Sequence, residues 1–203
     1  GHLGVYAGNG GPLTDYDSLA QRLRKLQVVV EVIPMVEGQA MATARGTASG
    51  VLVRGISADD LRHHKILAQN IRAGSLNGFG SDSDILVGTR FAQRFGLSIG
   101  DSITLVAPQS QVTAFGSVPR LKSFRIGATF EIGMYEYDSS FVFVPIQAAQ
   151  TFFRTGPDAV TDLEVMLTTG GFDFYKKAAV DLDPATLGSD TMKKAFDRLI
   201  QMK

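Results

Sequence analysis

The stretch SITLVAPQSQVTAFGSVPRLKSFRIGATFEI, residues 102–132, decides the fold of this chain. A Gly-Asp turn signal at 100–101 precedes a predicted strand over 102–107. Residues 124–132 alternate between apolar and polar side chains, which is typical of a half-buried antiparallel strand. The two ends therefore predict a strand pair joined by a long connection.

That connection is too long for a tight turn, yet its residues are not those of a flexible polar loop. Pro108 and Pro119 bracket it, Val112 and Val118 are β-branched, and Phe115 lies near its midpoint. This layout predicts an extended hairpin arm that protrudes from the domain. An exposed Phe at its tip would anchor the arm in a partner's pocket. The alternative, that Phe115 folds back onto its own domain, is equally compatible with the pattern.

Composition excludes several classes of protein. The 203 residues are 44% hydrophobic, and 20 basic residues balance 20 acidic ones, so a nucleic-acid binder is not expected. The absence of cysteine excludes disulfides, Cys-zinc sites and thiol catalysis. The most apolar run, Val28–Val36, is interrupted by Glu31 and Pro34 and is shorter than the ~18–20 residues of a membrane span. Spans of a longer parent protein could lie outside this sequence.

Helices and strands alternate in the rest of the chain, and the balance predicts an α+β fold with mostly antiparallel strands. Capping boxes at Thr14/Asp17 and Ser57/Asp60 predict two helix starts. The predicted elements are a helix over 14–26, strands over 28–33 (ending at Pro34), 39–44 and 50–56, a helix from Ser57 to about Gln69, a loop over 73–83, a helix ending at Gly96, a strand over 140–144, a helix from Pro145 to Arg154, a strand over 163–167 and a terminal helix from Asp190.

The histidines make a weak case for a metal site. His63 and His64 are adjacent, so on a helix their side chains point about 100° apart and do not naturally bind one ion. Asp59 and Asp60 precede them, but Asp60 is explained by capping. His2 lies at the very start of the sequence. No metal site is expected.

The acidic residues and the glycine-rich stretch make an equally weak case for catalysis or a cofactor. Asp82, Asp84, Glu136 and Asp138 fall in polar segments without a partnered nucleophile or base, so we interpret them as solvated turn acids. GNGG at 8–11 lacks the spacing of a nucleotide-binding loop. We expect a non-catalytic domain without cofactors; a hydrolase or metal enzyme using His63, His64 or these acids is the weakest hypothesis.

Several segments, in order, resemble one family. They are GHLGVY, IPMVEGQAM, GVLVRGIS, ILVGTRFAQRFGLSIGDSITL, TAFGSVPRLKSF, FRIGATFEIGMYEYDSS and VPIQAAQTFF. Together they resemble the periplasmic domain of the lipoprotein-releasing ABC transporter permeases LolC and LolE, within the wider group of MacB-like and FtsX-like permeases. The resemblance covers most of residues 1–170, and 171–203 match it least.

The resemblance implies a MacB-like periplasmic fold of two parts. An α/β layer called Porter would comprise 1–43 and 143–203, and a β-rich insertion called Sabre would comprise 44–142. The parent would be an inner-membrane protein with four membrane helices, working with the cytoplasmic ATPase LolD and a second permease subunit. Together they would extract lipoprotein cargo and pass it to the periplasmic chaperone LolA.

In LolC-type subunits of this family a hairpin hook recruits LolA by entering its lipid-binding cavity, and a nearby surface pad assists. The matching hook is 108–122, with the pattern T-x-x-G-x-x-P on Thr113, Gly116 and Pro119. The tip pair is Ala114 and Phe115, where Ala114 departs from the proline common in LolC. The implied partner-binding residues are Pro108, Val112, Thr113, Ala114, Phe115, Gly116, Val118 and Pro119 in the hook, and Arg120, Leu121 and Lys122 in the pad and base.

Two alternatives stay open. The hook favours a LolC-type subunit, whereas MYEYDSS (134–140) is typical of species with a single hybrid, LolF-like permease. The chain could instead be a MacB-like or FtsX-like permease domain that binds a different periplasmic partner and makes no use of 108–122.

Overall fold

The computed structural model describes residues 3–81, 84–113 and 116–168, and the chain divides into two compact units. The first unit is Gly1–Pro34 with Thr161–Lys203, and the second is Met35–Val160. The predicted terminal helix from Asp190 lies outside the described residues.

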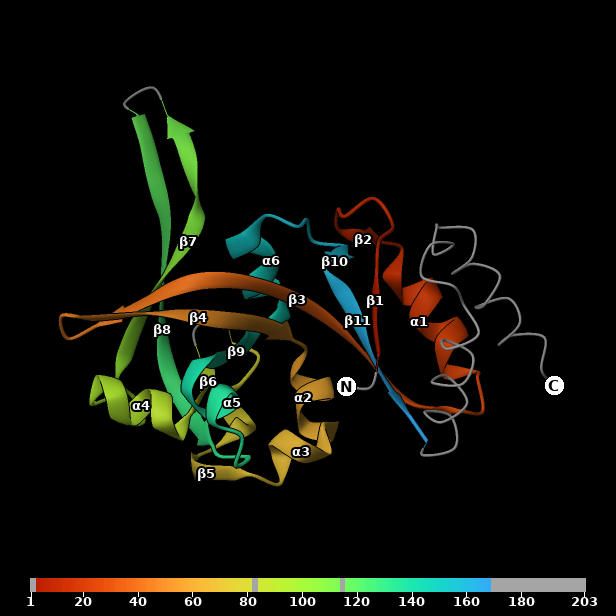
Figure 1. The fold of residues 1–203 in the computed structure, drawn as a ribbon, viewed down its shortest axis with the longest axis horizontal. Coiled ribbons are helices and arrows are strands. Elements are labelled where there is room, and N and C mark those ends of the chain that lie inside the picture. Colours follow the sequence, from red (N-terminus) through yellow and green to blue (C-terminus); the bar gives the residue numbers. More distant parts are fainter. Residues whose placement is uncertain (1–2, 82–83, 114–115, 169–203) are drawn as a thin grey trace. The chain divides into compact units, whose positions relative to one another are not determined.

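In its described residues, 3–34 and 161–168, the first unit contains a small sheet and the helix α1 (Figure 1). Strand β1 (Leu3–Tyr6) runs antiparallel to β11 (Asp162–Leu167), and β11 is followed in the sheet by the start of β3 (Val29–Ala44). Strand β2 (Leu13–Thr14) leads into α1 (Tyr16–Arg24), which buries Ala20 and Leu23. The Arg24 guanidinium donates a hydrogen bond to the Val32 carbonyl over 2.8 Å and so ties α1 to β3.

The second unit contains the rest of β3 and most of the remaining elements. They are β4 (Thr47–Ile56), α2 (Ala58–His63), α3 (Lys65–Ala68), β5 (Ile71–Gly74), the 3-10 turn η1 (Leu76–Gly78), β6 (Asp84–Gly88), α4 (Thr89–Phe95), β7 (Ser102–Thr113), β8 (Gly116–Phe130), α5 (Tyr135–Ser140), β9 (Phe141–Pro145), α6 (Ile146–Phe153) and β10 (Ala159–Val160).

Six strands of the second unit pair in a closed ring, in the order β3–β4–β9–β6–β8–β7 and back to β3, with β5 added beside β8. The β4–β9 and β6–β8 pairs are parallel, and the other pairs are antiparallel. A closed sheet leaves no unpaired edge around the ring, so the unit is held by backbone hydrogen bonds as well as by its core.

Aromatic side chains fill much of this core. Phe124 and Phe130 point inward from β8, as the alternation predicts, and both are almost wholly buried. The rings of Phe130 and Phe143 meet edge to face with centroids 5.6 Å apart. Helix α6 packs so closely on β4 that a Cβ atom on Gly55 would lie 2.3 Å from the Ala149 side chain.

The local sequence signals have mixed outcomes. The Ser57 cap is confirmed, because its hydroxyl accepts from the Asp60 backbone N–H over 3.0 Å. Gly96 adopts the left-handed conformation after α4, also as predicted. The Thr14 cap is wrong, since α1 starts after Asp15, whose side chain makes no capping hydrogen bond.

Two predicted boundaries are also wrong. Pro34 does not end a strand: β3 runs through it, and its pairing with β4 begins only at Val36, so the missing N–H breaks no hydrogen bond of that ladder. The helix expected from Ser57 to Gln69 is broken at His64, where the backbone is extended between α2 and α3.

Candidate partner-binding hairpin

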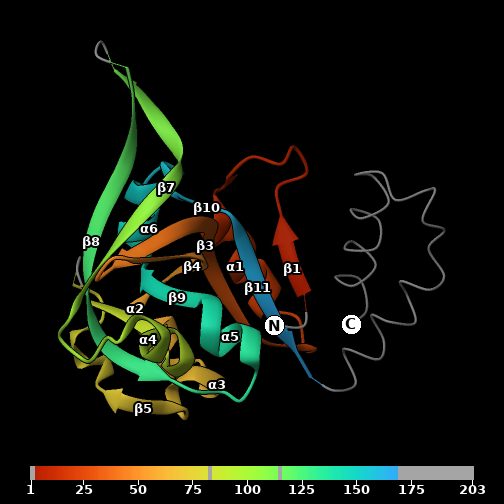
Figure 2. The ribbon, with the colours of Figure 1, turned by 60° about the vertical axis from the view of Figure 1, so that its left-hand side comes forward.

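Strands β7 and β8 leave the ring together as a two-stranded ribbon (Figures 1 and 2). Their register runs from Ser102↔Arg125 to Val106↔Leu121 and resumes from Ser110↔Pro119 to Thr113↔Gly116. We call residues 108–122 the hook ribbon. The predicted hairpin arm is therefore present as paired backbone.

A bulge separates the two stretches of pairing. Three residues of β7, 107–109, lie opposite Arg120 alone, so the ladder is interrupted between Val106 and Ser110. Pro108 lies in this bulge, where its missing N–H breaks no pair. The bulge marks the point at which the hook ribbon departs from the body of the unit.

The tip residues expected to bind a partner are only partly within the described chain. Val112, Thr113, Gly116 and Val118 belong to the paired backbone of the ribbon. Ala114 and Phe115, the predicted tip pair, lie outside the described residues. The role of Phe115 as an anchor stays a prediction.

The base of the ribbon has two different faces. Pro119 and Leu121 are exposed, and Leu121 is 60% accessible. Arg120 and Lys122 are half-buried on the opposite face, as alternation along a strand requires. The structure thus brings Arg120 and Lys122 together and separates Leu121 from them.

Leu121 has apolar neighbours that sequence reasoning missed. Met41 of β3 lies opposite Val106, and Val106 lies opposite Leu121, so the three side chains form one row across three strands. Met41 is also exposed. No local signal could have found this row, because strands far apart in the chain supply it.

Arg120 is tied to its own domain. One guanidinium N–H donates to the carbonyl of Phe152 at the end of α6, and its Nε is buried without a partner. Burial, together with the charge of Arg154, lowers the pKa of Arg120 from its ordinary value. Lys122 places its Nζ 5.4 Å from the centre of the Phe124 ring, a cation–π contact.

His63 and His64, the histidines in the described part of the chain, do not form a metal site. His63 is exposed and its Nδ1 lies 2.8 Å from the Asp59 carbonyl, whereas His64 is buried. Within the described residues, no group of three or more His, Asp or Glu side chains is placed to hold an ion. His2 lies outside the described part of the chain.

Two of the four acids interpreted as solvated are in fact structural. Asp84 is buried at the start of β6 and accepts from Arg125 over 2.8 Å. Asp138 is 1% exposed, and its carboxylate accepts from the backbone N–H groups of Ile132 and Gly133. Both were misread because local sequence does not show burial. Glu136 is exposed, as predicted, and Asp82 is outside the described residues.

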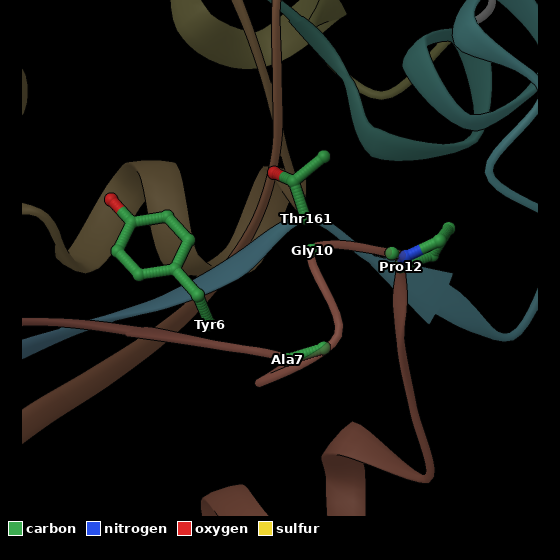
Figure 3. Close-up of a pocket in the computed structure, with 6 residues that line it drawn as sticks. Tyr6, Ala7, Gly10, Pro12 and Thr161 are labelled. Carbon is green, nitrogen blue, oxygen red and sulfur yellow. The ribbon is translucent and has the colours of Figure 1, made fainter. Parts of the chain in front are cut away.

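The glycine-rich stretch at 8–11 borders a shallow pocket of about 300 Å³ in the first unit (Figure 3). Its lining residues are Tyr6, Ala7, Gly10, Gly11, Pro12 and Thr161. None of them carries a charge, so the pocket offers no cationic side chain to a phosphate group. It lends no support to a nucleotide site.

A family model, the MacB-like periplasmic core domain, matches residues 1–172. The chain belongs to this family. The α+β, MacB-like fold predicted from the sequence is confirmed. Within the described residues of this MacB-like domain, no helix has the length and apolarity needed to span a bilayer.

Curated relatives confirm the resemblance to LolC and LolE. The lipoprotein-releasing system transmembrane protein LolC of Neisseria meningitidis is 30% identical over 142 residues, which are 70% of this chain and 34% of that protein. LolC of Xylella fastidiosa is 27% identical over 184 residues, 89% of this chain and 44% of that protein. The chain therefore spans less than half the length of these relatives.

A shorter match is of a different kind. A probable sugar-binding periplasmic protein of Brucella suis is 54% identical over 43 residues, which are 21% of this chain and 10% of that protein. A match over 43 residues gives no information about the other four-fifths of the chain.

Solved structures share the fold. The extracellular domain of the noncanonic ABC-type transporter YknZ from Gram-positive bacteria aligns with a TM-score of 0.54 at 16% identity, covering 86% of each chain. The periplasmic region of MacB from Actinobacillus actinomycetemcomitans gives a TM-score of 0.53 at 12% identity, covering 97% of this chain and 81% of that one. Identities this low bear on the fold alone.

Proposed function

We propose that this domain recruits the periplasmic chaperone LolA through the hook ribbon, so that outer-membrane lipoproteins extracted from the inner membrane are handed over. The main support for this role is the paired backbone of the hook ribbon. Its outer backbone pairs from Ser110↔Pro119 to Thr113↔Gly116, above the bulge at its base. A narrow arm of this kind can enter a cavity that a flat sheet face cannot.

The tip sequence supports the same role. Phe115 stands between the last paired residues, Thr113 and Gly116, and a large apolar side chain there would be buried in an apolar cavity on docking. Burying a Phe-sized side chain contributes about 1.5–3 kcal/mol. If binding also buries Val112 and Val118, the ribbon should bind with an affinity on the order of micromolar. Such affinity suits a chaperone that must leave once loaded.

The relatives also indicate what kind of longer protein contains this domain. The relatives are named for a lipoprotein-releasing system, and this chain matches only part of each. We place the domain in the periplasm as part of an inner-membrane permease, acting with the ATPase LolD and a second permease subunit. In that assembly this domain performs no catalysis, since ATP hydrolysis belongs to the cytoplasmic subunit.

The test is a titration of this domain with the cognate LolA. Wild type should bind saturably, and Phe115→Asp should bind at least tenfold more weakly because a carboxylate would have to enter an apolar cavity. Tyr135→Asp is the matched control: Tyr135 is an aromatic residue that is 70% exposed and lies in α5, away from the ribbon. It should bind as wild type does.

Equal binding by wild type and Phe115→Asp would refute the hook. If removal of 109–118 also left binding of another periplasmic protein unchanged, the MacB-like alternative would replace this proposal.

A further inference from the structure

Two hairpins of the second unit are each tied to a helix end by an arginine. In the turn between β3 and β4, Arg45 donates to the carbonyl of Gly96, just after α4. On the hook ribbon, Arg120 of β8 donates to the carbonyl of Phe152 in the last turn of α6. Figures 1 and 2 both show α6 beside the lower part of the ribbon. The second contact therefore joins the ribbon to the body of the unit.

The carbonyl that Arg120 reaches belongs to a firmly held helix end. The last four carbonyls of an α-helix have no partner within the helix, and a side chain from elsewhere satisfies one of them here. Phe152 is buried, and its ring meets that of Phe153 edge to face with centroids 4.9 Å apart. The Phe153 ring covers Gly38 of β3, where an added Cβ atom would lie 2.6 Å from it. The end of α6 is thus a fixed point for the ribbon.

Arg120 lies at the bulge, where the ladder between β7 and β8 is interrupted. Residues 107–109 of β7 face it together, and regular pairing resumes only at Ser110↔Pro119. A bulge bends its strand and disrupts the ladder locally. In the described chain, β7 is the strand that pairs with β8 beyond this point. Backbone pairing therefore leaves the ribbon able to bend here.

The two arginine contacts are not equally satisfied. Arg45 donates to the Asp101 carboxylate over 2.9 Å as well as to its carbonyl. Arg120 has no carboxylate partner among the described residues, and its Nε is buried without an acceptor. A buried N–H without an acceptor destabilises the folded state, which offsets the gain from the bond to Phe152. We therefore expect Arg120 to add little to the stability of the domain.

We propose that Arg120 is a positioning residue that holds the hook ribbon in one direction by bonding to the end of α6. Without this bond the ribbon swings about the bulge at 107–109. Only a fraction of the molecules then present the ribbon as a docking protein needs it, and the apparent affinity falls by that fraction. The effect on docking rests on the proposed function; the direction of the ribbon does not.

The direction of the ribbon is measured first, without any partner protein. The sequence has no cysteine, so spin labels on Gln111→Cys in the ribbon and Arg62→Cys in α2 give one distance distribution by pulsed electron paramagnetic resonance. In this background Arg120→Gln should broaden the distribution about twofold or more, because the ribbon samples several directions. Arg120→Lys, which keeps a cationic donor, should restore much of the narrow distribution. An unchanged width in Arg120→Gln would overturn the proposal.

Arg45→Gln is the matched control, because it removes an arginine contact with a helix-end carbonyl from the other hairpin. It should leave the width of the distribution unchanged; equal broadening by Arg45→Gln would overturn the proposal. Thermal unfolding separates positioning from stability. Arg120→Gln should unfold near the midpoint of wild type. A broad distribution together with a large fall of the midpoint would show that the body itself had loosened, and would also overturn the proposal.

The second test uses LolA. Arg120→Gln should lower the association rate constant about three- to tenfold and leave the dissociation rate constant unchanged, since only the fraction of correctly directed ribbons falls. The loss should be the same at low and at high salt. A loss that disappears at high salt would indicate a direct charge contact between Arg120 and LolA, and would overturn the positioning role.

The outcomes separate this inference from the proposed function. If Arg120→Gln broadens the distribution but binds LolA as wild type does, while Phe115→Asp does not bind, the effect on docking is refuted and the hook stands. If wild type itself fails to bind LolA, the proposed function fails, and the spin-label distances alone decide the role of Arg120. Amide spectra of each variant, compared with wild type, establish that it is folded.

Discussion

Residues 124–130 of β8 and residues 116–119 of the same strand have different surroundings. The lower stretch is flanked by β7, β6 and β5, and its inward side chains are buried. In the described chain the upper stretch pairs with β7 alone. One strand thus contributes to the core at one end and to a free ribbon at the other.

The difference separates stability from recognition. Side chains between sheet and helices contribute through burial, whereas a two-stranded ribbon in water is marginal by itself. The ribbon is held by the ring below it, so its tip can vary without unfolding the domain. Four changes, from the largest expected loss of stability to the smallest, test this separation.

Phe130→Ala should reduce the free energy of unfolding by about 3–5 kcal/mol, because it opens a cavity where Phe130 now meets Phe143. Chemical denaturation followed by circular dichroism measures the loss. Tyr135→Ala removes an exposed aromatic residue and should cost less than about 1 kcal/mol. Equal losses of stability for the two variants would show that the interior of the closed sheet is not the main hydrophobic core.

Asp138→Ala should cost about 1–3 kcal/mol, because the backbone N–H groups of Ile132 and Gly133 lose their acceptor. Glu136→Ala, two residues away and exposed, should stay within about 0.5 kcal/mol of wild type. The same denaturation experiment compares the two. A small effect at Asp138 would mean that this loop does not depend on the buried carboxylate.

Ser57→Ala should cost about 1 kcal/mol, since α2 loses the side chain that accepts from the Asp60 N–H. Thr14→Ala is the contrasting variant, because Thr14 lies in β2 and does not cap α1. Its midpoint of thermal unfolding should equal that of wild type. A drop at Thr14 matching that at Ser57 would contradict the assigned caps.

Replacing residues 109–118 by Asn-Gly should change the free energy of unfolding by less than about 1 kcal/mol, because the ladder from Ser102↔Arg125 to Val106↔Leu121 remains. Binding of LolA should be lost. Thermal unfolding measures the change in stability, and the LolA titration measures the loss of binding. A large loss of stability would show that the hook ribbon is part of the core. The contrast between the two parts of β8 would then be wrong.

Local sequence predicted much of the fold because its signals act over short distances. Alternation over 124–132 needs only the period of a strand, and Phe124, Ile126 and Phe130 are buried as it requires. The hairpin followed from two neighbouring strands and the residues between them. The strands expected over 50–56, 140–144 and 163–167 are present as β4, β9 and β11.

The errors have a common cause. Asp84 and Asp138 stand in polar segments that resemble loops, but Arg125 and the backbone of Ile132 and Gly133 hold their carboxylates in the interior. Pro34 resembles a strand end, yet the β4 ladder simply starts beyond it. For the two carboxylates, contacts made in the folded chain override local preference, and for Pro34 the β4 strand pairs only with later residues of β3.

Some features of the candidate site were likewise predictable from the sequence, and others were visible only in the structure. The sequence by itself determined the hairpin, its paired arms and the residues of its base, because strand period and turn length are properties of adjacent residues. Only the tertiary structure decided that Arg120 and Lys122 face away from Leu121, that Met41 joins Leu121 in one row, and that Arg120 donates to the Phe152 carbonyl of α6. Those facts depend on which strands and helices pack together, and packing joins residues that the chain keeps far apart.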